Sequence, residues 1–241
     1  MNPPKQPTLW RHIYDTLSRE IGDRYAPGAK LPTEAELARR FAVNRHTVRR
    51  ALAALAEGGR IHVRRGAGAF VTQARLDYAI GPRTRFSQNL TAAGHTSERH
   101  LLRIETLAAD TTERRHLALA KGAQVHVAES FSRSDGVPVA YKRMAFPADR
   151  LPGLPQALRD APSVTAALAG CGIADYQRLW TRLTAERPGA IIARHLHMPE
   201  TSPVLRSESL DADITGVPVE YGIAWFCSER IQLVVDRSSF P

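Results

Sequence analysis

The amino-acid sequence predicts an α+β chain with two domains, one mainly helical and the other built on an antiparallel sheet. Its 241 residues are enough for two ordinary domains. Apolar residues recur at helical spacing up to about residue 57, whereas short strand-like segments predominate after residue 81. Charge also divides unevenly: residues 1–75 carry 14 Lys and Arg against 6 Asp and Glu, a net charge of +8, and the remainder carries only +1.

The N-terminal helices are predicted from their apolar faces and their caps. A first helix is expected over residues 8–22, with apolar residues four apart. Thr33 and Glu36 have the spacing of a capping box, which starts a short second helix. Asn44 is the expected N-cap of a third helix that ends at Glu57, before two glycines. This third helix is apolar on one side and basic on the other.

A basic hairpin is expected directly after these helices. Its strands are residues 61–64 and 69–72, and its turn contains Gly66 and Gly68. Two helices at a tight turn followed by a basic hairpin are the pattern of a winged helix-turn-helix. Positive charge gathered in one module suits the neutralisation of DNA phosphates. We therefore expect residues 1–72 to bind double-stranded DNA, with residues 73–80 as a linker.

Specific motifs occur in the same order along this segment. They are Pro27-Gly28, Leu31-Pro32-Thr33-Glu34, Val43 to Leu52, and Gly66 to Val71. Residues 8–72 thereby resemble the GntR family of bacterial transcription regulators. The resemblance implies that Arg45, Thr47 and Arg49 contact operator DNA and that Gly66 approaches it from the wing. Some members carry an arginine where this chain has Ala35.

The chemistry of the side chains divides the DNA contacts into two kinds. Arg45 and Arg49 lie one turn apart near the start of the third helix, where arginines reach guanine edges. Short polar side chains and helix-end amides suit phosphates. Arg50 is either a phosphate contact or a solvated charge. The expected DNA-binding residues are Thr33, Asn44, Arg45, His46, Thr47, Arg49, Arg50, Arg64, Arg65 and Gly66. A homodimer is expected, because palindromic half-sites mirror a two-fold protein.

The C-terminal domain, residues 81–241, shows an internal repeat. Asp135–Tyr141 and Thr215–Tyr221 are nearly the same heptapeptide, and each follows a strand and a helix that ends in His-Leu. We expect two similar halves that build one antiparallel sheet, with each heptapeptide at a hairpin turn. The expected strands are residues 99–107, 124–134, 137–146, 177–185, 204–213, 217–226 and 231–236, and the expected helices are 111–119, 163–169 and 188–196.

The segments Arg85–Leu90, Thr181-Arg182 and Pro218–Tyr221 give this domain a resemblance to the UTRA effector-binding domain of the HutC-type branch. That resemblance implies a chorismate-lyase-like fold that binds an effector and dimerises. It is nearest to regulators of phosphonate utilisation, and it implies a repressor switched by a small phosphorus-containing anion. The alternatives are a regulator that responds to another metabolite, such as a sugar phosphate or urocanate, and a chorismate-lyase-like enzyme.

An anion sensor needs hydroxyls, amides and an arginine that converge on one point. Arg133 should point away from Ser132, since neighbouring strand residues face opposite sides, so Arg85 or Arg182 is the better candidate for that arginine. For the serines, an ordinary sheet or surface hydroxyl is the alternative. The candidate effector-binding residues are Arg85, Ser87, Ser130, Ser132, Arg133, Ser163, Arg182 and Glu220.

Other kinds of chemistry have little support in the sequence. His195 and His197 lack a third metal ligand in register, and we expect no metal and no cofactor. Cys171 and Cys227 are expected to be reduced thiols of a cytoplasmic protein. No apolar run approaches the roughly 18 residues of a membrane helix. Because the sequence shows no nucleophile elbow and no poised acid–base pair, we expect a regulator rather than an enzyme.

Overall fold

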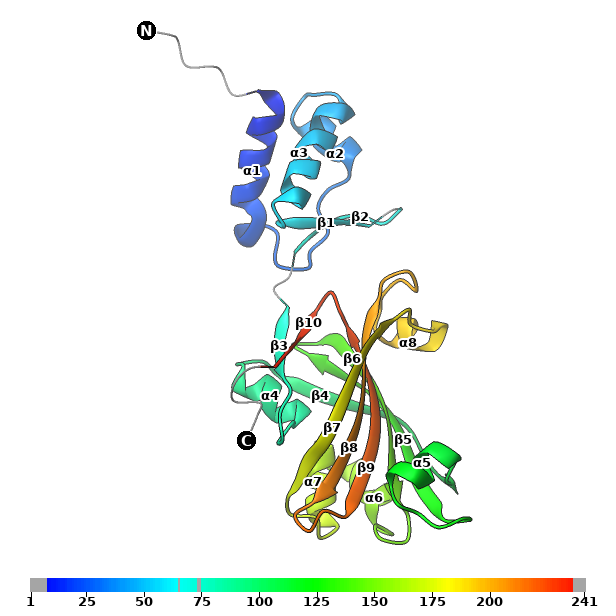
Figure 1. Cartoon of the computed structure of the whole chain (residues 1–241). Helices are drawn as coiled ribbons and strands as arrows, with labels where there is room; N and C mark the ends of the chain where they lie inside the picture. The colour runs from blue at the N-terminus through cyan, green and yellow to red at the C-terminus, as the bar shows by residue number, and fades with distance from the viewer. Residues whose placement is uncertain (1–7, 65, 73–74, 236–241) are drawn as a thin grey trace. The chain divides into compact units, whose positions relative to one another are not determined.

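The computed structural model describes residues 8–64, 66–72 and 75–235, and of Arg64 only the backbone. Contacts divide the chain into two compact units, and the boundary between them in the sequence falls between residues 74 and 75. The first unit contains three helices and a hairpin, and the second contains a large sheet with helices on both faces (Figure 1). The two predicted domain types are therefore both present.

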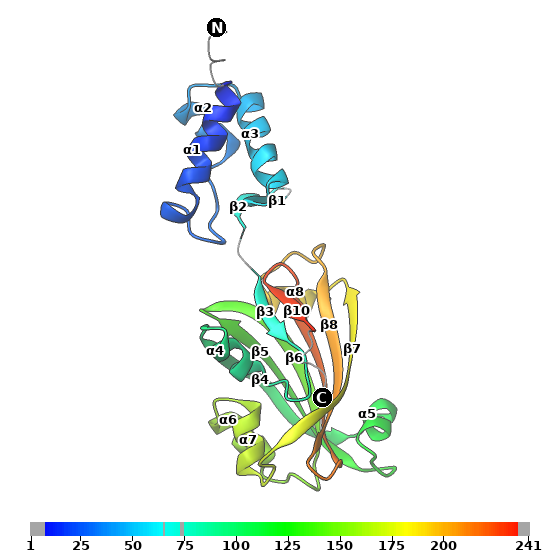
Figure 2. The same cartoon turned by 60° about the vertical axis from the view of Figure 1, so that its left-hand side comes forward.

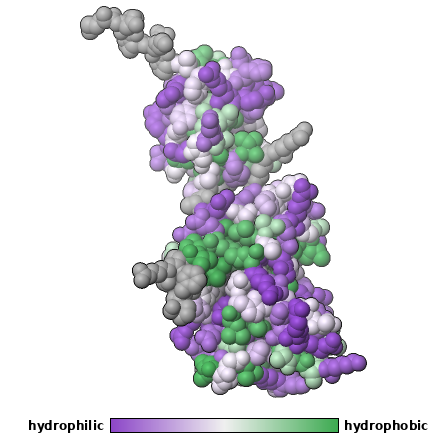
Figure 3. All heavy atoms as spheres, in the orientation of Figure 1, coloured by the Kyte–Doolittle hydropathy of each residue, from purple (hydrophilic) through white to green (hydrophobic). Residues whose placement is uncertain are grey.

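The first unit has the predicted helix–helix–helix–hairpin order. The helices are α1 (Leu9–Asp23), α2 (Glu34–Arg40) and α3 (Arg45–Glu57), and the antiparallel strands are β1 (Ile61–Arg64) and β2 (Gly68–Val71). Leu17, Leu37 and Leu55 contribute one side chain from each helix to a common core, and all three are fully buried. Hydrophilic side chains predominate on the face of this unit that Figure 3 shows. The amphipathic pattern of the sequence thus packs as expected.

The second unit is built on a six-stranded antiparallel sheet with the strand order β4-β5-β6-β9-β8-β7. Its strands are β4 (Ser97–Ala108), β5 (Gln124–Ser134), β6 (Val137–Pro147), β7 (Tyr176–Glu186), β8 (Val204–Asp213) and β9 (Pro218–Cys227). The first three strands form one half and the last three form the other, and the halves join through β6 and β9. This arrangement confirms the repeat that the two heptapeptides indicate.

The repeat extends to side chains that cross between the halves. The helix α5 (Thr111–His116) follows β4, and α8 (Ala190–His195) follows β7. His116 stacks on Tyr221 of the other half, with 4.9 Å between ring centroids, and His195 lies 5.5 Å from Tyr141. Both tyrosines end a heptapeptide. Each helix therefore covers the hairpin of the opposite half, which ties the two halves into one sheet.

Helices cover both faces of this sheet (Figure 2). One face carries α5 and α8, whose buried residues pack on the odd-numbered residues of β5 and β6. The other face carries α4 (Phe86–Ala92), α6 (Leu154–Asp160) and α7 (Val164–Gly170), together with the parallel pair β3 (Leu76–Ala79) and β10 (Ile231–Val234). The side chains on this second face include most of the inward-pointing polar residues of the unit.

The prediction of a linker over residues 73–80 is wrong for its second part. Residues 73 and 74 lie outside the described residues, but residues 76–79 form β3. Leu76 and Tyr78 are buried, and β3 pairs with β10 about 155 residues further along the chain. A four-residue strand whose partner is so distant gives little local signal. The helices α4 and α6 were not predicted either.

Candidate DNA-binding face and ligand cavity

The first turn of α3 presents positive charge to solvent. Arg45, His46 and Arg49 are exposed, while Val48 on the opposite side of the helix is fully buried in the core. Arg45 and Arg49 lie one helical turn apart on this exposed face. An exposed basic first turn is the part of a helix-turn-helix that enters the major groove.

Arg49 is held by an acidic residue of the preceding helix. Its Nε and Nη2 donate to the two carboxylate oxygens of Glu34, at 3.2 and 2.9 Å. These hydrogen bonds lower the pKa of Glu34 and raise the pKa of Arg49. Since the Arg49 side chain is 62% exposed, the pair adds little stability, but it orients the guanidinium. Two of the five guanidinium N–H groups are used in this way, and the others are free for a ligand.

The short polar side chains at this surface close the ends of helices. Thr33 Oγ1 accepts from the Glu36 amide at 3.3 Å, and the Thr33 amide donates to the Glu36 carboxylate at 2.7 Å, which completes the predicted capping box. Asn44 Oδ1 accepts from the amide and the hydroxyl of Thr47, at 2.9 and 3.0 Å. If Thr33, Asn44 or Thr47 contacts a phosphate, the same side chain must also keep its capping hydrogen bond.

Three further predicted DNA contacts have other surroundings. Arg50 lies over the ring of Trp10 on α1, with 4.7 Å between Cζ and the ring centroid, so it points away from the first turn of α3. The side chain of Arg64 and the whole of Arg65 lie outside the described residues. Gly66 is exposed and has φ +76°, a conformation that glycine adopts without strain. The conformation of Gly66 supports the predicted wing turn. The contact with Trp10 shows that the Arg50 side chain packs on α1.

A cavity lies on the sheet face that α4, α6 and α7 cover. The small side chains of β8 and β9 leave space at the surface of the sheet, which forms the floor of the cavity. Ser209 pairs with Gly222 and Ser207 with Ala224 across these two strands. The residues that line the cavity include Tyr78, Thr84, Phe86, Ser87, Ser97, Arg99, Ser132, Lys142, Met144, Ser163, Thr165, Tyr176, Arg178, Ser207, Ser209, Asp211, Glu220, Gly222 and Ala224.

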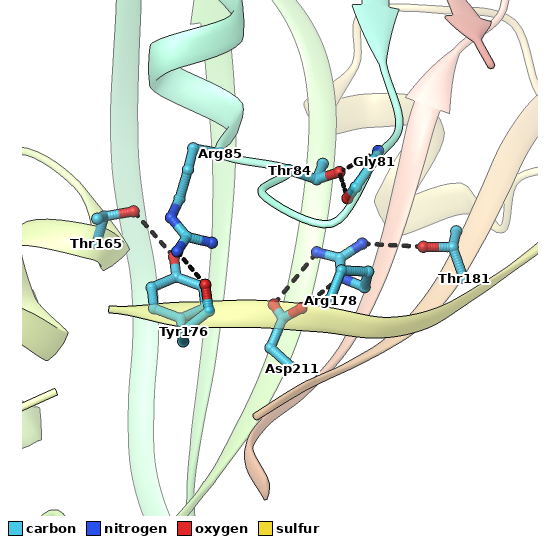
Figure 4. Close-up of polar contacts among 8 residues, drawn as sticks. All are labelled: Gly81, Thr84, Arg85, Thr165, Tyr176, Arg178, Thr181 and Asp211. Atoms are coloured by element: carbon cyan, nitrogen blue, oxygen red, sulfur yellow. Dashed lines mark hydrogen bonds and ion pairs between the residues drawn. The ribbon is translucent and has the colours of Figure 1, made fainter. Parts of the chain in front are cut away.

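Arg178, which lines the cavity, and Arg85, which packs on the lining residue Tyr176, are both held by contacts within the protein (Figure 4). Arg178 donates through Nε and Nη2 to both carboxylate oxygens of Asp211, and its Nη1 lies 3.2 Å from Thr181 Oγ1. Burial lowers the pKa of Arg178, but the charge of Asp211 outweighs it and leaves that pKa raised. Arg85 lies over the ring of Tyr176 at 3.3 Å and donates to the backbone carbonyl of the same residue. Arg178 is therefore engaged through all three of its nitrogens, whereas Arg85, which also donates to Asp175 at 3.1 Å, keeps a buried Nη1 without a hydrogen-bond partner among the described residues.

Lys142 and Glu220 bring opposite charges into the cavity. Lys142 Nζ lies 3.6 Å from the centroid of the Phe86 ring. Burial lowers the pKa of Lys142 to about 7, and burial together with the charge of Asp211 raises the pKa of Glu220 to about 7. Both side chains are thus poised to gain or lose charge near neutral pH, depending on what occupies the cavity.

Arg99 supplies a further charged group to the cavity. Its Nη2 donates to the carbonyl oxygens of Leu158 and Ala161, at 2.5 and 2.7 Å. Within the described part of the chain, its buried Nε and Nη1 have no hydrogen-bond partner. Burial also lowers the pKa of Arg99. A buried guanidinium with unused donors is the kind of group that binds an anion.

Comparison with known proteins now identifies both units. Residues 9–71 match the family described as bacterial regulatory proteins, gntR family, and residues 92–232 match the UTRA domain. The chain belongs to the GntR family of transcriptional regulators, in its UTRA-containing, HutC-type branch. It is a DNA-binding regulator of transcription by family, and its relatives are transcriptional regulators rather than enzymes.

Similar proteins cover nearly the whole chain. An uncharacterized HTH-type transcriptional regulator of Rhizobium meliloti (strain 1021) is 34% identical over 95% of this chain and 94% of its own length. The probable transcriptional regulator PhnF of Escherichia coli (strain K12) is 30% identical over 98% of each chain. The crystal structure of PhnF from Mycobacterium smegmatis matches with a TM-score of 0.65 and 26% identity, over 93% of this chain and 98% of that one.

The GntR-type unit and the UTRA unit therefore have the predicted fold. In the described parts of the chain, no helix is long and apolar enough to cross a membrane.

The cavity brings together only part of the predicted effector-binding set. Ser87, Ser132, Ser163 and Glu220 line it. Ser130 is fully buried beside its cross-strand partner Lys142, and its hydroxyl has no partner among the described residues. Arg85 packs on Tyr176, as stated above.

Arg133 and Arg182 lie away from the cavity. Arg133 is near the Phe131 ring, at 5.5 Å, and Arg182 is near the Trp180 ring, at 4.5 Å, on the other face of the sheet. The sequence indicated Arg182 as a possible anion ligand because Arg133 was expected to face away from Ser132. A bulge between Arg178 and Trp180 reverses the alternation of β7, which places Arg178 and Arg182 on opposite faces.

Several residues of the cavity were not predicted. The most important are Arg99, Lys142, Arg178 and Asp211, with the floor serines Ser207 and Ser209. One signal was present in the sequence: Lys142 interrupts the apolar run from Val137 to Phe146, and a charge in a central strand is costly unless it has a use.

Proposed function

We propose that this protein regulates genes of phosphonate uptake and degradation, as a dimeric repressor that binds a palindromic operator and is switched by a small phosphonate or phosphate-type effector. Residues 1–72 would bind the DNA, and residues 81–241 with β3 would bind the effector and dimerise. The observation that carries the effector proposal is the cavity that Lys142 and Arg99 line, where the buried Nε and Nη1 of Arg99 have no hydrogen-bond partner in the described part of the chain. Similarity to proteins named PhnF supports the phosphonate class.

Operator recognition is proposed to depend on Arg45 and Arg49. Both are exposed at the start of α3, and an arginine that reads a guanine through two hydrogen bonds contributes about 1–3 kcal/mol of discrimination. Thr33, Asn44, His46, Thr47 and Gly66 would position the helix and wing on phosphates. Arg50 has a smaller expected part, because it packs on Trp10.

The segment that enters the UTRA unit offers a route for control. β3 follows the DNA-binding unit directly, and its residue Tyr78 lines the cavity, as does Ile80 just after it. A ligand that contacts these side chains acts on the strand that leads to the DNA-binding unit. Binding energy that differs between two arrangements of β3 would therefore change operator affinity.

DNA binding is tested by selecting duplexes from a random library with the full chain and then measuring fluorescence anisotropy. Arg45→Ala and Arg49→Ala should each weaken binding to the selected duplex by about 5- to 150-fold, with a much smaller loss on unselected DNA. Arg24→Ala removes the same charge from the exposed end of α1 and serves as the matched control. Equal losses on both duplexes would refute base reading by these arginines. Selected duplexes without two half-sites would refute the palindromic dimer.

The effector class is tested by thermal shift. Alkylphosphonates or inorganic phosphate should raise the melting temperature of the UTRA unit, because a ligand stabilises the folded state that binds it. A shift produced only by a sugar phosphate or by urocanate would replace the phosphonate proposal with another effector class. Turnover of a bound compound would favour a chorismate-lyase-like enzyme.

A further inference from the structure

Apart from Arg178, which forms an ion pair with Asp211, the charged residues of the cavity are separated by sign along the strands. Lys142 on β6 pairs with Ala224 on β9. Arg99 pairs with Ser132, which places it on the side of Lys142 away from Glu220. Glu220 precedes Ala224 by four residues on the same strand, so its Cα lies roughly 14 Å from that of Ala224 along the strand. The cavity therefore has a cationic end and an acidic end.

At the acidic end, the Glu220 carboxylate forms no ion pair with any described residue. Asp211 lies level with Glu220 across β8 and β9, but Arg178 already forms an ion pair with Asp211 through both carboxylate oxygens. Among the described residues, no ion pair or hydrogen bond joins Glu220 to Lys142. The two side chains reach into one cavity from different levels of the sheet, and each charge acts on the pKa of the other without forming an ion pair.

Leaving these groups apart has an energetic cost. A buried charge without a partner is unfavourable by several kcal/mol, so such groups shift their pKa or find a counter-ion. Burial raises the pKa of Glu220 to about 7 and lowers that of Lys142 to about 7, and the attraction between the two charges offsets only part of each shift. Arg99 has two buried N–H-bearing nitrogens without acceptors in the described part of the chain. A ligand with one charge of each sign would satisfy both ends at once.

We propose that the effector is a small zwitterion, whose anionic group binds Arg99 and Lys142 and whose ammonium group binds Glu220. Hydroxyls of Ser132 and Ser163 at the cavity wall would donate to the anion. This inference rests on the proposed function for the identity of the anion and makes the ligand a short phosphonate with a primary amine. A phosphonate without the amine would leave Glu220 buried and unpaired.

The probes are 2-aminoethylphosphonate and ethylphosphonate, which differ only by the amine. Isothermal titration calorimetry with the full-length protein at pH 7.5 should show the amine-bearing compound binding at least about tenfold more tightly. Inorganic phosphate serves as the anion without an alkyl chain and should bind more weakly than 2-aminoethylphosphonate.

Two variants assign the charges to their partners. Glu220→Gln should abolish the preference for the amine-bearing compound. It should weaken the binding of 2-aminoethylphosphonate by about tenfold and leave the binding of ethylphosphonate unchanged or tighter. Lys142→Met should weaken the binding of both phosphonates and preserve the ratio of their affinities. Glu105→Gln, an exposed glutamate of the edge strand β4, is the matched control and should leave both affinities unchanged. Melting curves establish that each variant is folded, and the comparison of the two phosphonates on the wild-type protein does not depend on any variant.

The outcomes separate this inference from the proposed function. If the wild-type protein binds both phosphonates equally, the zwitterion is refuted and phosphonate sensing stands. If Glu220→Gln keeps the preference, the assignment of the ammonium group to Glu220 is refuted. If neither phosphonate binds while a sugar phosphate or urocanate does, the proposed function and the inference both fail.

Discussion

The ion pair between Arg178 and Asp211 gives a sharp test of how the UTRA unit is held together. The side chains are 14% and 3% exposed, and two nitrogens of the guanidinium donate to the two carboxylate oxygens. Removal of one partner from such a buried pair leaves an uncompensated charge and costs about 3–5 kcal/mol. Arg178→Met and Asp211→Leu should each lower the free energy of unfolding by that amount. The double variant should lose far less, since no charge remains unpaired.

Urea unfolding followed by tryptophan fluorescence measures these changes. Trp180 and Trp225 both belong to the UTRA unit, so a Trp10→Phe background makes the signal report on that unit alone. The coupling energy between the two single variants should reach several kcal/mol. Single-variant losses below about 1 kcal/mol, or losses that add in the double variant, would show that water screens this pair and would refute the reasoning.

Three further perturbations follow from the local geometry. Thr33→Ala removes the capping box of α2 and should lower the stability of the first unit by about 1 kcal/mol, measured by thermal unfolding. Asp135 accepts from the Thr96 backbone amide, which helps to lower its pKa to about 2, so Asp135→Asn should destabilise the protein at pH 5 but not at pH 2. A Cβ at Gly222 would lie 3.1 Å from Glu220 Oε1, so Gly222→Ala should reduce 2-aminoethylphosphonate affinity by about tenfold in calorimetry.

For each of these three variants, one result would contradict the prediction. A Thr33→Ala protein as stable as the wild type would mean that solvent replaces the cap. Because folding depresses the pKa of Asp135, its ionised carboxylate stabilises the folded protein at pH values above the unfolded pKa near 4. This stabilisation is lost as the pH falls toward 2. A stability difference that persists at pH 2 would contradict that assignment. Unchanged affinity in Gly222→Ala would place the ligand away from this part of the floor.

The first unit could be predicted closely because its signals are local. Caps, apolar spacing and the glycines of the wing all act within a few residues, so the boundaries of α3 were expected at Asn44 and Glu57 and occur there. The repeated heptapeptides likewise indicated two halves, and the Asp135-Gly136 turn has positive φ at both residues, as a type I′ hairpin turn requires. What these signals do not contain is the pairing of distant segments, such as β3 with β10.

The cavity could be predicted only in part, because its residues come from strands that meet only in the folded sheet. Ser132 and Glu220 were expected in it, and Lys142 was not. Arg182 was assigned to the same site although a bulge turns its part of β7 to the opposite face. A single extra residue in a strand reverses every later side chain, and bulges leave little trace in one sequence. Register therefore limited the prediction more than residue chemistry did.

The most direct test of the account is the effect of a phosphonate on operator binding by the full-length protein. Anisotropy of a selected, labelled duplex gives the operator Kd with and without saturating 2-aminoethylphosphonate, for the wild type and for Lys142→Met. The account predicts that the ligand changes the wild-type Kd by at least about fivefold and that the variant responds only at much higher ligand concentration. An operator Kd that no phosphonate alters, while urocanate or a sugar phosphate does alter it, would contradict it.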